Sequence, residues 1–151
     1  MDHKTSRQVI IVGGGRVGRR TAAQLAEKGY IVTIIERDPE KEALIPDHPV
    51  NRVILGDGTD VDVFQKANPA TADVVAALTD STETNLAVCE LAGEVVPRAQ
   101  TLLRIQKDGQ QDYAHLGHVD NIVYPAAAGA SVATSQIAGS GEIPISGSQG
   151  R

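Results

Sequence analysis

Three glycines near the start of the chain follow an apolar run at a spacing that could serve binding chemistry. Gly13, Gly15 and Gly18 form the pattern G-x-G-x-x-G directly after Val9-Ile10-Ile11-Val12. Between a strand and a helix, the first glycine permits a tight turn, the second lets the backbone approach a pyrophosphate, and the third lets the helix pack close to the sheet. The phosphates would lie on the amides and the dipole of the helix N-terminus.

A carboxylate follows at the position where a ribose would lie beside such a turn. Glu36 ends the second apolar run, where it could accept hydrogen bonds from an adenosine ribose, each worth about 1.5 to 3 kcal/mol. Its charge would repel a ribose 2′-phosphate, so we expect NAD(H) or another unphosphorylated adenosine rather than NADP(H), although the neighbouring Arg37 weakens this preference. In the alternative reading, the glycines form a turn without a ligand and Glu36 is a solvated charge.

Arg16 lies inside the glycine pattern, in the first turn of the helix that we expect there. A guanidinium at this place could bind a pyrophosphate or a terminal phosphate. The alternative is an ordinary exposed arginine at a helix end. We expect Arg16 to contribute to nucleotide affinity.

Six apolar runs supply the elements that would position these residues. They are rich in β-branched residues and continuous rather than alternating, as in strands that are buried on both faces. Segments with helical spacing lie between them, so the order predicts an α/β fold with a doubly wound, six-stranded parallel sheet and helices on both faces. The runs cover residues 9–12, 31–35, 53–55, 74–78, 101–103 and 122–123.

Capping signals predict where the helices begin and end. The first helix covers about 16–28 and ends before Gly29, a residue favoured just past a helix. Asp38 followed by Pro39 predicts an N-cap with proline at the first helical position. Thr59 and Asp80, each with an acidic residue three positions later, predict capping boxes at the start of the third and fourth helices.

Polar residues follow the third, fourth and fifth strands. In open parallel sheets, ligands bind beyond the carboxyl ends of the strands, near the point where the strand order reverses. Asp57 and Thr59 could meet an adenine, and Thr79 and Asp80 would border the middle of the crevice. Thr59 and Asp80 could also serve only as helix caps. Arg104 ends the fifth strand and could face the crevice, an adjacent subunit or solvent.

Length and charge bound the remaining function classes. A chain of 151 residues accommodates one domain with a sizeable core, and a second full domain does not fit. The formal net charge of -5 gives a long-range field that repels nucleic acid and anionic lipid. The start of the chain does not read as a signal peptide, and no apolar run approaches the ~20 residues of a membrane helix. We expect no nucleic-acid partner, no membrane insertion and a cytosolic location.

The cysteine and the histidines predict neither a disulfide nor a metal site. Cys89 is the only cysteine, and its position three residues after Leu86 in the fourth helix predicts core packing. No two histidines have metal-ligating spacing on one helix face, although the last two are three residues apart. The histidines are His3, His48, His115 and His118.

Small residues dominate the chain from Ala126 onward. Pro125 could start a helix that carries Val132 and Ile137 as sparse apolar positions. Glycine, serine and proline are frequent from Ser140, as in flexible segments. We therefore expect a nucleotide-binding domain over residues 1–138 and a flexible tail, or a linker to an absent C-terminal domain, over 139–151.

Several motifs together are specific enough to indicate a family. GGGRVG, GDGTD, LTDSTETN and HVDNIVYP resemble the N-terminal (TrkA-N) domain of Trk/Ktr-type potassium-uptake regulators, also called the RCK or KTN domain. The resemblance covers about residues 7–130. It implies a Rossmann-like fold in a cytoplasmic regulatory subunit or domain, peripheral to the inner face of the cell membrane. Such domains pair as a homodimer or a larger ring beneath a potassium-translocating membrane protein, and binding of NAD(H), ATP or ADP gates transport.

The resemblance also implies roles for residues at the matching motif positions. The glycine loop and Arg16 would hold phosphates, Glu36 the ribose, and the GDGT segment the adenine, while residues after the fourth strand would lie along the crevice and at a subunit contact. The helix after Pro125 would lead to a C-terminal ligand-binding domain. The predicted nucleotide-binding residues are Gly13, Gly14, Gly15, Arg16, Val17, Gly18, Glu36, Arg37, Gly56, Asp57, Gly58, Thr59, Leu78, Thr79, Asp80 and Glu83.

An enzyme is the alternative class of function. An NAD-dependent oxidoreductase fragment would need a substrate pocket and a proton donor or acceptor opposite the nicotinamide. The nucleotide-binding unit takes up the chain, so we expect no catalytic residue and no enzymatic activity. A methyltransferase is a weaker option, because its glycine loop usually continues G-x-G-x-G and Val17 occupies that place.

Overall fold

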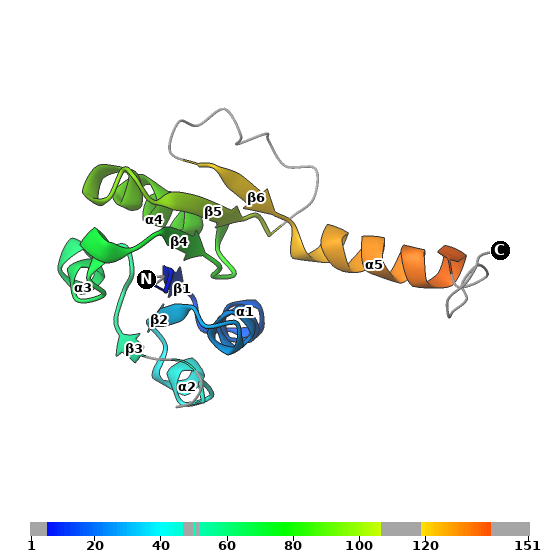
Figure 1. Ribbon diagram of the computed structural model, residues 1–151, viewed down its shortest axis with the longest axis horizontal. Helices are drawn as coiled ribbons and strands as arrows, with labels where there is room; N and C mark the ends of the chain where they lie inside the picture. Colours follow the sequence, from blue (N-terminus) through cyan, green and yellow to red (C-terminus); the bar gives the residue numbers. More distant parts are fainter. Residues whose placement is uncertain (1–5, 47–49, 51, 107–118, 140–151) are drawn as a thin grey trace, which may run out of the picture.

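The computed structural model describes residues 6–46, 50, 52–106 and 119–139, and a parallel β-sheet forms its centre (Figure 1). Each strand pairs in parallel with its neighbours, in the order β3-β2-β1-β4-β5-β6. This confirms the predicted six-stranded parallel sheet. The strands are β1 Gln8–Val12, β2 Ile31–Glu36, β3 Arg52–Leu55, β4 Val74–Ala77, β5 Gln100–Arg104 and β6 Asn121–Val123.

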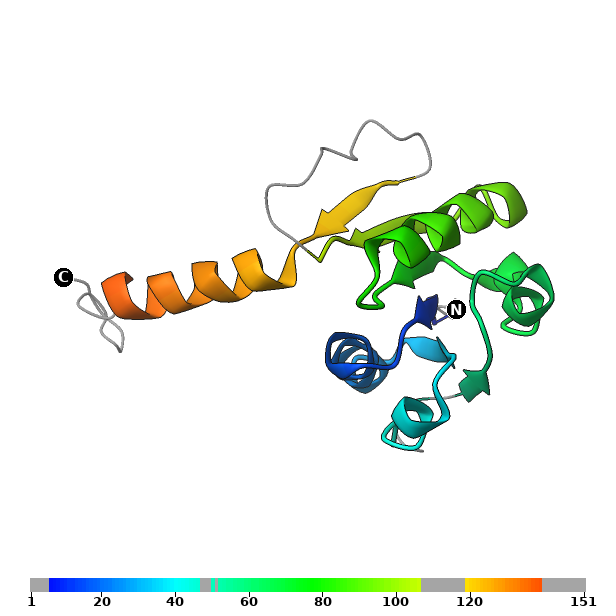
Figure 2. The same ribbon diagram turned by 180° about the vertical axis from the view of Figure 1, so that it is seen from behind.

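Helices cover both faces of this sheet. Figures 1 and 2 show α1 and α2 on one face and α3 and α4 on the other, as the predicted doubly wound arrangement requires. The strand order reverses between β1 and β4, because β2 and β3 extend the sheet in one direction and β4 to β6 in the other. The helices are α1 Arg16–Glu27, α2 Pro39–Glu42, α3 Val61–Gln65, α4 Thr82–Val95 and α5 Pro125–Gly139, with a 3-10 turn at Pro69–Thr71.

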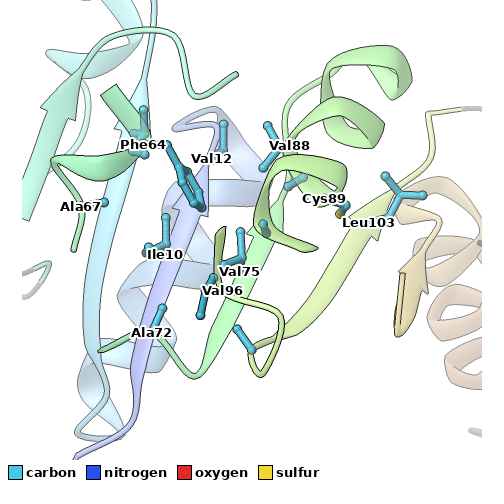
Figure 3. Packing of buried hydrophobic residues seen from close by; sticks show 14 of the residues in the cluster. Ile10, Val12, Phe64, Ala67, Ala72, Val75, Val88, Cys89, Val96 and Leu103 are labelled. Carbon is cyan, nitrogen blue, oxygen red and sulfur yellow. The ribbon is translucent and has the colours of Figure 1, made fainter. Parts of the chain in front are cut away.

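The side chains of β1 explain how one strand supports both faces. Successive residues of a strand point to opposite sides. Val9 and Ile11 therefore pack into the cluster beneath α1, whereas Ile10 and Val12 pack into the cluster beneath α3 and α4. Figure 3 shows Phe64, the only phenylalanine, packed from α3 against Ile10 and Val12. The continuous apolar run is thus a consequence of burial on both faces.

Capping of α1 and α2 agrees with the prediction. The first helix ends before Gly29, which has a φ of +95°, a conformation that favours glycine. The second is capped by Asp38, whose Oδ1 accepts a hydrogen bond from the Glu40 amide at 2.9 Å, with Pro39 as the first helical residue.

The predicted caps of α3 and α4 are each wrong by one residue. Asp60, not Thr59, caps α3, with its carboxylate accepting from the Asp62 amide at 2.8 Å. The Thr59 hydroxyl instead donates to the Asp57 carboxylate at 2.7 Å. Similarly, Ser81 rather than Asp80 caps α4. Both predicted positions precede residues that also have side-chain oxygens, so the spacing alone could not separate the two registers.

The last helix projects away from the sheet. Figures 1 and 2 both show α5 extending beyond β6, and its side chains are exposed along almost its whole length. Val132 retains 60% of its accessible surface. The helix predicted after Pro125 is confirmed and continues through Gly139. Across the described part of the chain, the helices are too short or too polar to span a lipid bilayer.

Cys89 packs in the core, as predicted. Its side chain is fully buried next to Leu103 (Figure 3), and its thiol donates a 3.7 Å hydrogen bond to the Leu102 carbonyl. Burial raises the pKa of the Cys89 thiol to about 12, and the negative charge of Asp120 contributes in the same direction.

This environment predicts a thiol that reports on unfolding. Only the thiolate reacts, so the raised pKa and the burial of Cys89 should keep it unmodified by a disulfide reagent at pH 8 while the chain is folded. In guanidinium chloride the chain should react with one equivalent, because Cys89 is its only cysteine. Absorbance of the released thiolate measures this difference. Rapid stoichiometric labelling of a chain whose circular dichroism remains native would contradict the core assignment.

Candidate functional site

A cavity of about 590 Å³ lies at the carboxyl ends of the central strands, next to the point where the strand order reverses. This is where ligands bind in open parallel sheets, and the volume lies within the ~300 to 1,000 Å³ of typical ligand sites. Most of the predicted binding residues line this cavity. They are Gly13, Gly15, Arg16, Val17, Glu36, Arg37, Gly56, Asp57, Gly58, Leu78, Thr79 and Asp80.

Four predicted residues are not in the lining. A Cβ atom on Gly14 would collide with the Ile45 side chain, and the Gly14 amide donates to Glu36. Gly18 lies beneath the loop, where a Cβ atom would collide with the Gly13 carbonyl oxygen. Thr59 is exposed and bonded to Asp57, and Glu83 is an exposed residue of the first turn of α4. For these residues, direct contact with a ligand stays a prediction.

The glycine loop is held between the ends of β2 and β4. Gly13 has a φ of +112°, and its amide donates to the Ile35 carbonyl at 2.8 Å. A Cβ atom on Gly13 would lie 2.8 Å from the Thr79 amide nitrogen and 3.0 Å from the Leu78 carbonyl oxygen. Only glycine fits this combination of conformation and space. The loop geometry therefore depends on strands that are distant in sequence.

The N-terminus of α1 is open toward the cavity. Its N-cap is Gly15, which offers no side chain, so no side-chain oxygen of the described residues caps this helix. A Cβ atom on Gly15 would meet nothing within 4 Å. Arg16 and Val17 follow in the first turn and line the cavity. Unpaired first-turn amides beside open space are suited to an anion.

Glu36 closes the glycine loop onto β2. Its Oε1 accepts from the Gly14 amide at 2.6 Å and its Oε2 from the Asp38 amide at 2.8 Å, and the residue is only 7% exposed. The carboxylate therefore has a positioning role that the sequence did not indicate. The Gly13 and Gly14 amides are already bonded within the protein, so the amides open to a phosphate begin at Gly15. Each carboxylate oxygen can accept a further hydrogen bond.

Asp57 forms a tight turn at the end of β3. Its Oδ1 accepts from the Thr59 amide at 2.9 Å and from the Thr59 hydroxyl at 2.7 Å. The hydrogen bond from the Thr59 amide, and then the one from the Thr59 hydroxyl, lower the pKa of the Asp57 carboxyl below its usual value. Partial desolvation opposes this shift, and the positive charge of Arg37 lowers the pKa further. An ionised carboxylate therefore stands on the β3 side of the cavity.

Asn85 is a positioning residue that sequence reasoning missed. Its Oδ1 accepts from the Thr79 amide at 3.0 Å and from the Thr79 hydroxyl at 2.7 Å. Its Nδ2 donates to the Thr79 carbonyl at 3.0 Å and to the Arg104 carbonyl at 2.9 Å. This fully buried amide thus ties the end of β4 to the end of β5. The available signal was its place at the end of the LTDSTETN motif.

Cationic side chains slightly outnumber acidic ones around the cavity. Among them, Lys41 of α2 and Asp80 after β4 form an ion pair at 3.9 Å, with side chains that are 43% and 71% exposed. The balance is opposite in sign to the net charge of the chain, so an anion can be held locally. The cationic lining residues are Arg16, Arg19, Arg37, Lys41 and Arg104, and the acidic ones are Glu36, Asp38, Asp57 and Asp80.

The histidines cannot be placed in this site. All four lie outside the described residues, so the prediction that they hold no metal stays a prediction. Within the described ranges, no group of three His, Cys, Asp or Glu side chains is arranged to hold a metal ion.

Comparison with known proteins identifies related sequences. The model of the family described as "TrkA-N domain" matches residues 9–125. A Trk system potassium uptake protein TrkA homolog of Pyrococcus abyssi is 39% identical over 103 residues, which cover 68% of this chain and 45% of that protein. The Trk system potassium uptake protein TrkA of Vibrio alginolyticus is 30% identical over 123 residues, which cover 81% and 26%. The chain thus spans about half the length of these relatives or less.

Solved structures share the fold. The TrkA-N domain of the inner membrane protein ybaL from Escherichia coli has a TM-score of 0.75 at 17% identity, over 89% of this chain and 99% of that one. The GsuK bound to ADP has a TM-score of 0.73 at 22% identity, over 87% and 34%. The GsuK channel bound to NAD has a TM-score of 0.65 at 15% identity, over 82% and 22%.

The Asn85 network predicts that an isosteric change destabilises the fold. Asn85→Asp keeps the shape but removes both donors, leaving the Thr79 and Arg104 carbonyls unpaired and a charge buried. Loss of buried partners costs about 1 to 3 kcal/mol per group, so the urea midpoint should fall clearly. The matched change Asn68→Asp, at an exposed residue before the 3-10 turn, serves as the control. Equal midpoints for the two variants would refute the role of Asn85.

Proposed function

Because the chain belongs to the TrkA-N domain family, we propose that it is a regulatory domain that binds an adenosine nucleotide and controls a potassium transport system. The observation that carries this proposal is the cavity above the glycine loop, which combines an open helix N-terminus with a carboxylate at the end of β2. The helix N-terminus can hold a phosphate, and the carboxylate can accept hydrogen bonds from a ribose. The 39% identity to a Trk system potassium uptake protein TrkA homolog supports the transport context.

The cavity residues have distinct proposed roles. The amides of the first turn of α1 and the Arg16 guanidinium bind the phosphates. Glu36 accepts hydrogen bonds from the ribose hydroxyls while it holds the Gly14 amide. Asp57 and Gly58 border the adenine. A Cβ atom on Gly58 would lie 2.6 Å from the Val12 side chain, so a larger residue would disturb the floor of the cavity.

The ligand that we propose is an adenosine nucleotide without a 2′-phosphate, either NAD(H) or ATP/ADP. Glu36 is buried, and a 2′-phosphate beside its carboxylate would be repelled in a region of low dielectric constant. The GsuK structures bound to ADP and to NAD support both kinds of ligand on this fold. The same argument disfavours NADP(H).

Control of transport requires two states of the protein with different nucleotide affinities, because equal affinities shift no equilibrium. Coupling energies of about 1 to 3 kcal/mol are usual for such regulation. The proposed partner is a potassium-translocating membrane protein, and the proposed assembly is a homodimer or a larger ring on the cytoplasmic side of the membrane. The projecting α5, with its exposed small residues and Val132, supports a contact with another chain or domain.

The proposed role is regulatory and non-catalytic. The domain boundary at residue 138, with the remainder acting as a tail or linker, belongs to the same proposal. An oxidoreductase fragment is the alternative. Oxidation of NADH by the purified protein with added carbonyl substrates would favour that alternative, whereas binding without turnover favours regulation.

Calorimetric titration tests nucleotide binding directly. We expect saturable binding of ADP and NAD, and weaker binding after Gly15→Ala, because the added methyl group stands where the phosphate approaches the backbone. A tenfold loss corresponds to about 1.4 kcal/mol. Gly129→Ala is the matched control, since it makes the same change in open space on α5, away from the cavity. Absence of binding of NAD(H), ATP and ADP at millimolar concentration would refute the proposal.

Arg16 offers a second test of the phosphate position. Arg16→Ala should lower the affinity for ADP several-fold, because Arg16 lines the cavity at the open end of α1 and its guanidinium can bind a phosphate. Arg20→Ala removes the same charge from an exposed position one turn later that does not line the cavity. Equal ADP affinity of the two variants, measured by the same titration, would show that Arg16 does not contact the nucleotide.

A further inference from the structure

Arg104 places a guanidinium on the opposite side of the cavity from Glu36. It ends β5, is half-buried and lines the cavity. Its backbone is fixed, because the Asn85 amide donates to its carbonyl at 2.9 Å. Its Nη2 donates to the exposed Gln106 side chain at 2.9 Å, and its Nη1 to the Leu78 carbonyl at 3.3 Å.

The hydrogen bonding of this guanidinium is incomplete. Its Nε is buried and has no acceptor in the described part of the chain. Among the described residues, no carboxylate forms an ion pair with Arg104. By contrast, Arg98, which lies just before β5, forms an ion pair with Asp73. A buried donor without an acceptor is costly, and a guanidinium presents five donors in a fixed fork. Nη1 and Nη2 each carry a second N–H beyond their bonds to Leu78 and Gln106, so Arg104 has donors to spare for an anion.

The position of Leu78 relates this anion site to the glycine loop. The Leu78 carbonyl oxygen that Arg104 contacts would lie 3.0 Å from a Cβ atom on Gly13. One carbonyl group thus separates the guanidinium from the first glycine of the loop. Glu36 marks the ribose side of this loop, on β2, and Arg104 marks the far side, on β5. A phosphate chain that crosses the loop from the ribose approaches Arg104.

We propose that Arg104 binds the second phosphate of the nucleotide, so that the cavity distinguishes a nucleoside diphosphate from a monophosphate. The inference rests on the proposed nucleotide binding. A guanidinium can bind a phosphate through two parallel hydrogen bonds, which a lysine cannot reproduce. The first phosphate lies on the α1 amides and does not need Arg104.

A purely structural role of Arg104 has a different consequence. If the side chain only held the Leu78 carbonyl in place, its loss would disturb the wall next to Thr79 for every nucleotide. Affinities for AMP and ADP would then fall by the same factor. The ratio of the two affinities therefore separates binding of the second phosphate from support of the loop.

The experiment is a calorimetric titration of AMP and of ADP into the wild-type chain, Arg104→Gln, Arg104→Lys and Arg98→Gln. We expect the wild type to bind ADP at least tenfold more tightly than AMP. Arg104→Gln should reduce the ADP affinity to near that for AMP and leave the AMP affinity unchanged. The ADP affinity of Arg104→Lys should lie between those of the wild type and Arg104→Gln. Arg98→Gln makes the same change before β5, away from the cavity lining, and should keep the wild-type ratio.

The other outcomes overturn either the role of Arg104 or the proposed nucleotide binding. An unchanged ADP to AMP ratio in Arg104→Gln, or an equal loss for both ligands, overturns the inference while nucleotide binding stands. Failure of the wild type to bind either nucleotide overturns the proposed function and the inference with it. If thermal melting shows that Arg104→Gln is unfolded, the Arg104→Lys ratio decides the question, since that variant retains the charge.

Discussion

The close contact between the glycine loop and the ends of β2 and β4 is the constraint on which the rest of the site depends. The positive φ of Gly13 and its close approach to Leu78 and Thr79 leave no room for a side chain. Gly18 lies directly beneath the Gly13 carbonyl. Because the loop fits so closely, α1 begins over the middle of the sheet, and no side chain of the described ranges caps it. The open amides of α1 and the cavity above them are consequences of this packing.

One carboxylate and one side-chain amide hold the chain segments on either side of this contact. Glu36 bonds the Gly14 and Asp38 amides, and so joins the β1–α1 loop to the β2–α2 loop. Asn85 bonds Thr79 and the Arg104 carbonyl, and so joins the ends of β4 and β5. The two loops, and the two strand ends, are thereby held in place before any ligand binds. Preorganised loops of this kind reduce the entropy lost on binding.

Local charge in the cavity differs from the charge of the whole molecule. The chain has a net charge of -5, yet cations exceed carboxylates in the cavity lining. An acidic surface would slow the approach of an anion but does not determine its affinity, which depends on short-range hydrogen bonds and desolvated pairs. A nucleotide site is therefore compatible with an acidic protein, provided that the cations gather around the cavity.

The sequence alone determined the sheet, the glycine loop and the acidic residue at the end of β2, because continuous β-branched runs and glycine spacing act locally along the chain. It placed the caps of α3 and α4 one residue too early, since neighbouring side-chain oxygens compete for the same amides. Only the tertiary structure decided that Glu36 also bonds Gly14, that Asn85 connects two strands and that Arg104 faces the cavity. These contacts join residues about twenty positions apart on different strands and loops, and their partners are set by how the sheet brings the strand ends together.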